Sequence, residues 1–252
     1  MRTFYKDKLQ VKIADSRAEM GTIAGKDIAK KIRELLSVKE ELNIIFAAAP
    51  SQNETLASLL EADGIAWSRI NGFHMDEYVG LPEEDSRRFG NFLKMAIFSK
   101  KPFKSIHYIN GNAEDIEAEC QRYTDLLAAH PIDLVCLGIG ENGHIAFNDP
   151  PVADFDDPYV IKRVQLDEIC RQQQVNDGCF ATLDEVPKYA LTLTVPTLFK
   201  ADYLFCSVPA PTKANAVKAM LNDDINEACP ATILRQHTNA ILYCDNDSSA
   251  LL

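Results

Sequence analysis

His144 is the residue of this sequence whose setting most strongly suggests chemistry. It follows a turn from Gly138 to Gly143 with the pattern Gly-x-Gly-x-x-Gly, which comes directly after an apolar run, and Asp149 lies a few residues beyond it. A carboxylate beside an imidazole orients the ring and raises its pKa, which suits proton transfer. We therefore predict that His144 takes part in proton transfer.

The same glycines match, in isolation, the turn that binds dinucleotides. In a dinucleotide-binding fold these glycines open a long helix, and an acidic residue ends the next strand. Here Pro150 and Pro151 interrupt any long helix, and the acidic residues at the required spacing lie in a predicted loop. The sequence therefore disfavours a nucleotide site.

Two further loops carry charged residues. Asp76 and Glu77 are adjacent carboxylates after an apolar run, and one of them can act as a general base if it is partly withdrawn from water. The alternative for this pair is a solvated acidic turn. Lys213 lies in the first turn of a predicted helix, where a cation is unfavourable unless an anion binds. Its alternative is an ordinary exposed lysine.

The elements that must position these residues alternate along the chain. Apolar runs predict strands over residues 43–49, 67–73, 132–138, 159–166, 203–208 and 240–244. Periodic segments predict helices over residues 11–37, 54–62, 86–97, 113–129 and 211–221. Ser51 and Glu54 match a capping box at the start of the second of these helices. The alternation predicts one α/β domain over residues 1–252, with an open, mostly parallel, doubly wound (Rossmann-like) sheet and helices on both faces.

The topology of such a sheet predicts where the polar loops meet. Ligands bind beyond the carboxyl ends of parallel strands, because the loops there lie at one edge of the sheet. The loops after Ala49, Phe73, Leu137 and Val208 should therefore converge on one cleft. These loops hold most of the unusual polar residues of the sequence.

The composition restricts the partners. The 252 residues carry a net charge of −11 and contain no basic run, which argues against binding to nucleic acid or to a membrane. A small anionic substrate stays compatible, since a local pocket can be basic in an acidic protein. The seven cysteines form no Cys-x-x-Cys pair, and no apolar leader or membrane span is evident. We expect a cytoplasmic protein with reduced thiols.

Taken together, the loops resemble the glucosamine-6-phosphate deaminase/isomerase family. The resemblance lies in the segments 75–81 (MDEYVGL), 138–150 (GIGENGHIAFNDP), 186–192 (VPKYALT), 110–113 (NGNA) and 120–123 (CQRY). These segments occur in the same order over most of the chain. The family implies an open α/β sheet without metal or nucleotide cofactor, and it includes both monomers and hexamers. Its enzymes convert glucosamine 6-phosphate and water into fructose 6-phosphate and ammonia.

The resemblance also implies roles for individual residues. Asp76 matches the family's base, which moves a proton between C2 and C1. His144 matches the histidine that assists ring opening, and Asn142 and Asp149 hold the positions of its two acidic helpers. Lys213 matches a lysine that binds the 6-phosphate. These assignments agree with the candidates found from the residues alone.

The first loop departs from the family, whose phosphate turn is rich in Gly, Thr and Ser. Residues 49–55 (APSQNET) contain no glycine, although Ser51, Asn53 and Thr55 can donate hydrogen bonds to a phosphate. We expect Glu54 to serve the capping box and not to face the ligand. Arg171 is the nearest candidate for the family's phosphate-binding arginine.

Three kinds of function remain open on these grounds. The first is an isomerase and deaminase for an amino-sugar phosphate, with glucosamine 6-phosphate favoured over its galacto isomer. The second is a hydrolase of the same superfamily that acts on a 6-phosphogluconolactone. The third is a sugar-phosphate sensor without catalysis, which the altered first loop and Asn142 would suit.

Overall fold

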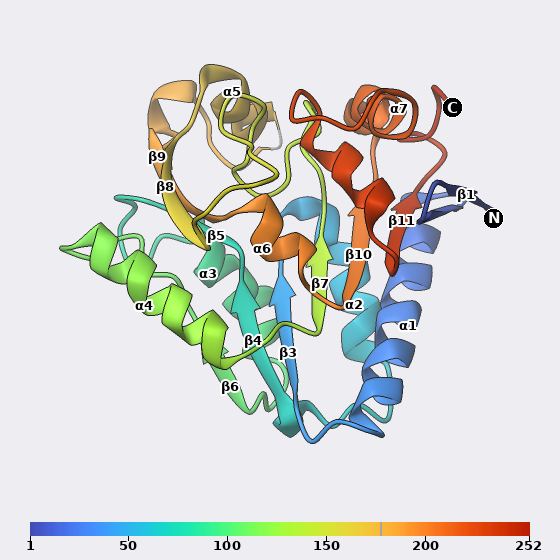
Figure 1. Cartoon of the computed structure of the whole chain (residues 1–252), viewed down its shortest axis with the longest axis horizontal. Helices are drawn as coiled ribbons and strands as arrows, with labels where there is room; N and C mark the ends of the chain where they lie inside the picture. The colour runs from blue at the N-terminus through green and yellow to red at the C-terminus, as the bar shows by residue number, and fades with distance from the viewer. Residues whose placement is uncertain (177) are drawn as a thin grey trace.

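A central sheet of eight strands organises the molecule (Figure 1), and the computed structural model describes residues 1–176 and 178–252. Its strands, in sheet order, are β1 (Arg2–Lys6), β2 (Leu9–Ile13), β11 (Ala240–Cys244), β10 (Tyr203–Val208), β7 (Leu134–Leu137), β3 (Leu42–Phe46), β4 (Ile70–His74) and β6 (Ser105–His107). Each neighbouring pair is parallel except β1 and β2, which form an antiparallel hairpin at one edge. The predicted open, mostly parallel sheet is therefore confirmed.

Helices cover both faces of this sheet. The helices are α1 (Arg17–Leu36), α2 (Asn53–Glu61), α3 (Phe89–Leu93) with the π-helical turn Lys94–Phe98, α4 (Ile116–Ala129), α6 (Val195–Phe199) and α7 (Ala214–Asn222). Successive strand side chains point to opposite faces, so Ile44 and Phe46 join the core under α1, α2 and α3, while Ile45 joins the core under α4, α6 and α7. The continuous apolar runs of the strands follow from this burial on both sides.

A second, smaller sheet lies beyond the carboxyl ends of the main strands. It consists of β5 (Asp76–Tyr78), β9 (Tyr189–Leu193) and β8 (Ile161–Gln165) in that order, all antiparallel, and α5 (Glu168–Asn176) packs beside it. A separate apolar cluster, which includes Tyr78, Phe147 and Phe180, fills the space beneath it. The strand predicted at 159–166 thus exists, but it belongs to this second sheet.

Some local predictions were wrong. The strand predicted over 67–73 begins only at Ile70, because Trp67–Arg69 forms a 3-10 turn. The helix predicted over 11–37 begins only at Arg17, because residues 9–13 form β2, whose alternate side chains enter the core. The capping box also does not form: Pro50–Gln52 is a 3-10 turn that runs directly into α2, so Ser51 lies inside the helical turn and does not cap it. Glu54 forms an ion pair with Arg17 instead.

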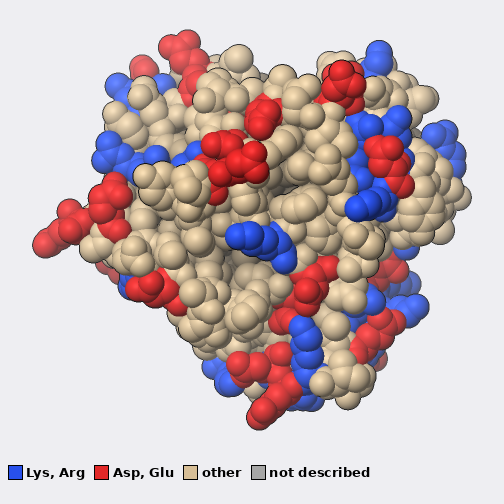
Figure 2. Space-filling model, in the orientation of Figure 1, with Lys and Arg blue, Asp and Glu red and all other residues tan. Residues whose placement is uncertain are grey.

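The surface and the cysteines agree with the composition. On the face shown in Figure 2, acidic and basic side chains are interspersed, and no broad basic area forms. All seven cysteines are free thiols, and six of them are buried. Among the described residues, no helix has both the length and the apolar content that crossing a bilayer requires.

Candidate active site

A pocket opens at the carboxyl edge of the main sheet, where the loops after β3, β4, β7 and β10 meet. The segments that follow these strands line it: residues 47–51 after β3, Met75 and Asp76 after β4, residues 138–140 and His144 after β7, and residues 209, 210, 212 and 213 after β10. The predicted convergence of four loops on one cleft is therefore confirmed.

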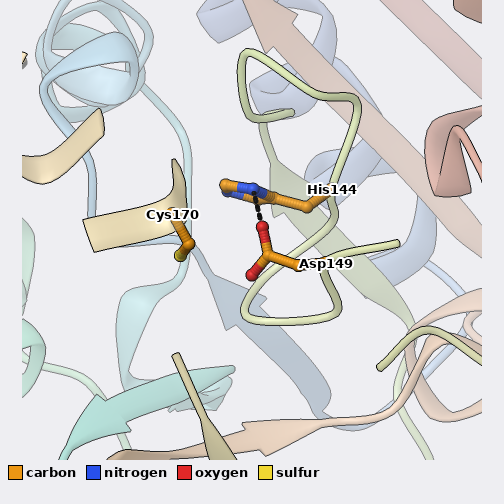
Figure 3. A group of neighbouring side chains, drawn as sticks. All are labelled: His144, Asp149 and Cys170. Carbon is orange, nitrogen blue, oxygen red and sulfur yellow. Dashed lines mark hydrogen bonds and ion pairs between the residues drawn. The ribbon is translucent and has the colours of Figure 1, made fainter. Parts of the chain in front are cut away.

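His144 and Asp149 form a hydrogen-bonded pair in the turn that follows β7 (Figure 3). The Nδ1 atom of His144 lies 2.9 Å from Oδ1 of Asp149, and both side chains are buried. Asn142 connects the two: its Nδ2 donates to the same Asp149 oxygen at 2.9 Å, and its Oδ1 accepts from the His144 backbone N–H at 3.1 Å. The bond at Nδ1 leaves Nε2 as the ring nitrogen that can exchange protons with a ligand.

The charge state of Asp149 suits this pairing. Burial acts to raise the pKa of Asp149, but the neighbouring His144 and the hydrogen bonds from His144 and Asn142 outweigh it, so the net pKa is lowered. The carboxylate is therefore ionised at neutral pH and holds the imidazole with a proton on Nδ1.

The backbone of the turn is shaped to carry the imidazole. The ring of His144 lies directly on Gly140: a Cβ at that position would come 2.2 Å from Cε1 and 2.3 Å from Nδ1 of the ring. Asn148 closes the turn, since its Nδ2 donates to the carbonyl oxygens of Ile145 at 2.8 Å and Leu193 at 2.9 Å. Glycine at 140 is thus a steric requirement of the histidine's position.

The adjacent carboxylates at the start of β5 have different environments. Strand alternation places them on opposite faces. Glu77 accepts three backbone hydrogen bonds, from Tyr78 at 2.9 Å and from Phe89 and Gly90 at 3.0 Å, and so anchors the start of α3. Asp76 lines the pocket, and burial together with the charge of Glu77 raises its pKa well above the ordinary value. Of the two, only Asp76 is placed to act on a ligand in this pocket.

Lys213 reaches the pocket from the turn before α7. Pro211–Lys213 is a 3-10 turn that leads into α7, and the side chain of Lys213 is buried where it lines the pocket. The sharp bend before it, with Ala210 at φ 87°, is held by Asp245, whose carboxylate accepts the Ala210 N–H at 3.1 Å. The residue is thus held near an open helix end, as the sequence predicted.

The first loop contributes only part of what the sequence predicted. Ser51 lines the pocket, but Asn53 is exposed outside it, and Thr55 is buried behind it with its Oγ1 at 3.0 Å from Oγ of Ser207. Gln52 ties the strand ends together: its Nε2 donates to the carbonyl oxygens of Leu137 at 3.2 Å and Ser207 at 3.3 Å. The structure therefore brings one of the three predicted hydroxyl or amide donors to the site.

The arginine at the pocket is Arg17, which the sequence analysis did not select. Arg171 is turned away, and its guanidinium donates to the carbonyl oxygens of Leu183 at 2.5 Å and Val186 at 3.0 Å. Arg17, the first residue of α1, lines the pocket and donates to Glu54 Oε1 at 2.8 Å and to the Pro50 carbonyl at 2.5 Å. A cation in the first turn of a helix is the signal that could have identified it, as it identified Lys213.

A further wall comes from α5, which the sequence did not predict as a helix. Gln173 and Gln174 line the pocket from it, and each is 7% exposed. The Oε1 of Gln173 accepts the Glu141 N–H at 2.9 Å, and the Oε1 of Gln174 accepts from the Tyr78 hydroxyl at 2.8 Å. The run of glutamines in this segment is the sequence feature that could have indicated these lining residues.

Cys170 of α5 approaches the imidazole–carboxylate pair from the other side. Its Sγ and the nearest donor atoms of His144 and Asp149 all lie within 4.8 Å of one another (Figure 3). A metal would need the thiolate, but burial and the charge of Asp149 raise the pKa of Cys170 far above neutrality. Cys170 therefore stays protonated beside the imidazole–carboxylate pair, and this trio suits proton chemistry better than metal binding.

Comparisons with known proteins fit this geometry. The sequence model of the family of glucosamine-6-phosphate isomerases/6-phosphogluconolactonase matches residues 15–160. A glucosamine-6-phosphate deaminase of Bacillus thuringiensis (strain Al Hakam) is 37% identical over 243 residues, which cover 96% of this chain and 88% of the relative. One of Bacillus cereus (strain G9842) is 36% identical over the same coverage.

Solved structures share the fold. A monomeric glucosamine-6-phosphate deaminase superposes with a TM-score of 0.86 at 29% identity, and the match covers 96% of this chain and 99% of that one. A 6-phosphogluconolactonase of Trypanosoma brucei superposes with a TM-score of 0.79 at 19% identity, over 96% of this chain and 98% of that one. By sequence and by fold, the chain belongs to the family of glucosamine-6-phosphate isomerases and 6-phosphogluconolactonases.

Proposed function

We propose that this protein isomerises and deaminates an amino-sugar phosphate, converting glucosamine 6-phosphate and water into fructose 6-phosphate and ammonia. The observation that carries the proposal is one pocket lined by a buried carboxylate, Asp76, a carboxylate-oriented imidazole, His144, and a cation, Lys213. The curated relatives named glucosamine-6-phosphate deaminase support the same reaction.

Asp76 is the proposed base of the isomerisation. The step removes the proton from C2, next to the carbonyl of the open sugar, and returns it to C1. A carboxylate with a raised pKa is a stronger base than an ordinary aspartate, and burial together with Glu77 supplies that shift. The same shift lets the protonated Asp76 hold the proton until C1 receives it.

His144 is the proposed ring-opening residue. With Nδ1 bound to Asp149, its Nε2 can take the proton of the C1 hydroxyl and supply one to the ring oxygen. Asn142 is neutral and serves as a positioning residue, because it binds both the Asp149 carboxylate and the His144 backbone. Asp149 orients the ring through the hydrogen bond at Nδ1.

The phosphate is proposed to bind between the two helix starts that carry cations. Lys213 precedes α7, Arg17 opens α1, and Ser51 lines the same pocket between the loops of β3 and β10. A helix start with a nearby cation attracts phosphate. Arg17 takes the place that the sequence assigned to Arg171. The free cysteines favour a reducing, cytoplasmic compartment for this small-molecule enzyme.

The test is ammonia release by the purified protein with glucosamine 6-phosphate, galactosamine 6-phosphate and 6-phosphogluconolactone supplied separately. We expect ammonia and fructose 6-phosphate from the first sugar. Ser51→Ala should raise KM for it, whereas Asn53→Ala is the matched control outside the pocket. Ammonia from the galacto sugar alone would change the substrate, acid release from the lactone alone would favour the hydrolase, and binding without turnover would favour the sensor.

A further inference from the structure

We propose that Gln174 is a sugar-binding residue, its amide nitrogen donating a hydrogen bond to a hydroxyl oxygen of the bound sugar phosphate. The inference rests on the function proposed above. Gln174 lines the pocket from α5, and its side chain is more than nine-tenths buried.

The oxygen of the Gln174 amide has a fixed partner. The hydroxyl of Tyr78 donates to Oε1 of Gln174 at 2.8 Å. Tyr78 is 1% exposed, and its ring packs against Phe89, Phe147 and Phe180 with centroids 4.7, 5.4 and 5.5 Å away. If the oxygen and nitrogen of the Gln174 amide were exchanged, the buried hydroxyl proton of Tyr78 would have no acceptor, which costs about 1–3 kcal/mol. The amide oxygen therefore faces Tyr78.

The amide nitrogen of Gln174 is consequently the group available to a ligand. Within residues 1–176 and 178–252, no hydrogen-bond acceptor is found for it. An N–H₂ group that lines a pocket and has no protein acceptor is placed to donate to a ligand that supplies one. The structure therefore calls for an oxygen atom of the ligand at this wall.

The position of Gln174 distinguishes a sugar oxygen from the phosphate. Tyr78 and Asp76 are two residues apart in β5 and share one face of that strand, so Gln174 is held on the side of the proposed base. The cation Arg17 opens α1, which packs on the main sheet, and the cation Lys213 lies in the turn between β10 and α7. A neutral donor beside the base suits a hydroxyl, and the two cations suit the phosphate.

Two variants of Gln174 separate the donor from the rest of the side chain. Gln174→Glu keeps the length and an acceptor for Tyr78 but removes the N–H₂ donor, and Gln174→Met keeps the volume without either group. The matched control is Gln172→Met on the same helix, because Gln172 is exposed and bonds only to Asn176 at 3.1 Å in the described residues. Folding is checked by circular dichroism and by the thermal midpoint of each variant.

The readouts are kcat/KM for glucosamine 6-phosphate and the inhibition constant of inorganic phosphate. We expect both Gln174 variants to lower kcat/KM by about 10- to 100-fold, because a lost hydrogen bond to a substrate hydroxyl leaves that hydroxyl buried and unpaired. The inhibition constant of phosphate should stay within about twofold of wild type, whereas Lys213→Ala should raise it. Gln172→Met should match wild type in both measurements.

Two results would overturn the inference. Folded Gln174→Glu and Gln174→Met proteins with wild-type kcat/KM would show that the donor is not used. A rise in the phosphate inhibition constant as large as that of Lys213→Ala would show that it serves the phosphate and not the sugar. If wild type releases no ammonia, the proposed function fails, and calorimetric binding of glucosamine 6-phosphate to wild type and to Gln174→Met still tests the contact.

Discussion

Replacing Gly140 by alanine should inactivate the protein through its effect on one imidazole ring. The new Cβ would lie 2.2 Å from Cε1 of His144. Carbon atoms in contact prefer about 3.5 Å, so the ring must move by about 1.3 Å. That movement breaks the 2.9 Å bond between Nδ1 and Asp149. A displacement of about 1 Å in a reacting group costs about 100-fold in rate, and we expect that loss in kcat/KM.

The cost in stability should be much smaller than the cost in rate. Overpacking a well-filled site destabilises by about 1–3 kcal/mol. For a chain of this size each kcal/mol lowers the thermal midpoint by about 2–4 °C, so Gly140→Ala should stay folded at assay temperature. The measurements are kcat/KM from ammonia release and the thermal midpoint of the same preparations.

A double-mutant cycle with His144→Ala decides whether the loss is transmitted through the ring. If the alanine at 140 acts only by displacing the imidazole, adding it to His144→Ala should change kcat/KM by less than about twofold. Equal losses in both backgrounds would show that Gly140 matters for another reason. A Gly140→Ala protein with more than half of the wild-type rate would refute the steric argument itself.

Asp76→Asn should abolish ammonia release at every pH, because the amide cannot act as a base. In wild type, kcat/KM should rise as the pH passes the pKa of Asp76. That pKa lies above the usual carboxylate range of about 4, because burial and the charge of Glu77 raise it. Because the pKa of Asp76 is higher in the folded than in the unfolded protein, its contribution to folding stability is complete at low pH and is lost as the pH rises through the folded-state pKa. Asp76→Asn should therefore raise the thermal midpoint more at pH 8 than at pH 4. An equal change at both pH values would contradict this. Cys170→Ala removes the buried thiol that lies within 4.8 Å of the nearest donor atoms of His144 and Asp149, and it should lower kcat about two- to tenfold. Cys170→Ser restores a polar group of similar size and should recover most of that loss. Identical kinetics of the alanine and serine variants would show that the thiol has no positioning role.

The parts of the site that could be predicted are those governed by the edge of the main sheet. Buried parallel strands read as continuous apolar runs, so β10 and β11 were predicted to the residue and β7 to within two residues at each end. Once they were placed, the rule that parallel strands end at one edge brought Asp76, His144 and Lys213 together. Local sequence and topology sufficed for these three.

What could not be predicted depends on contacts between distant segments. Val11 and Ile13 of β2 have a spacing that continues into the apolar pattern of α1, and only pairing with β11 shows that they are in a strand. Arg17 reaches the pocket because α1 packs on α2 so closely that a Cβ on Gly21 would lie 2.2 Å from that of Glu54. No local pattern reports such an approach.

The division between two sheets has a consequence for how such a site can diverge. The proposed base and the Gln173–Gln174 wall belong to the unit of β5, β9, β8 and α5, which has an apolar core of its own. The residues proposed to hold phosphate belong to the main sheet's loops and to the start of α1, which packs on that sheet. We therefore expect substitutions in α5 to alter contacts to the sugar without repacking the main sheet or altering the proposed phosphate site. In this arrangement the proposed phosphate site can stay constant among related proteins, while the wall that contacts the rest of the substrate varies.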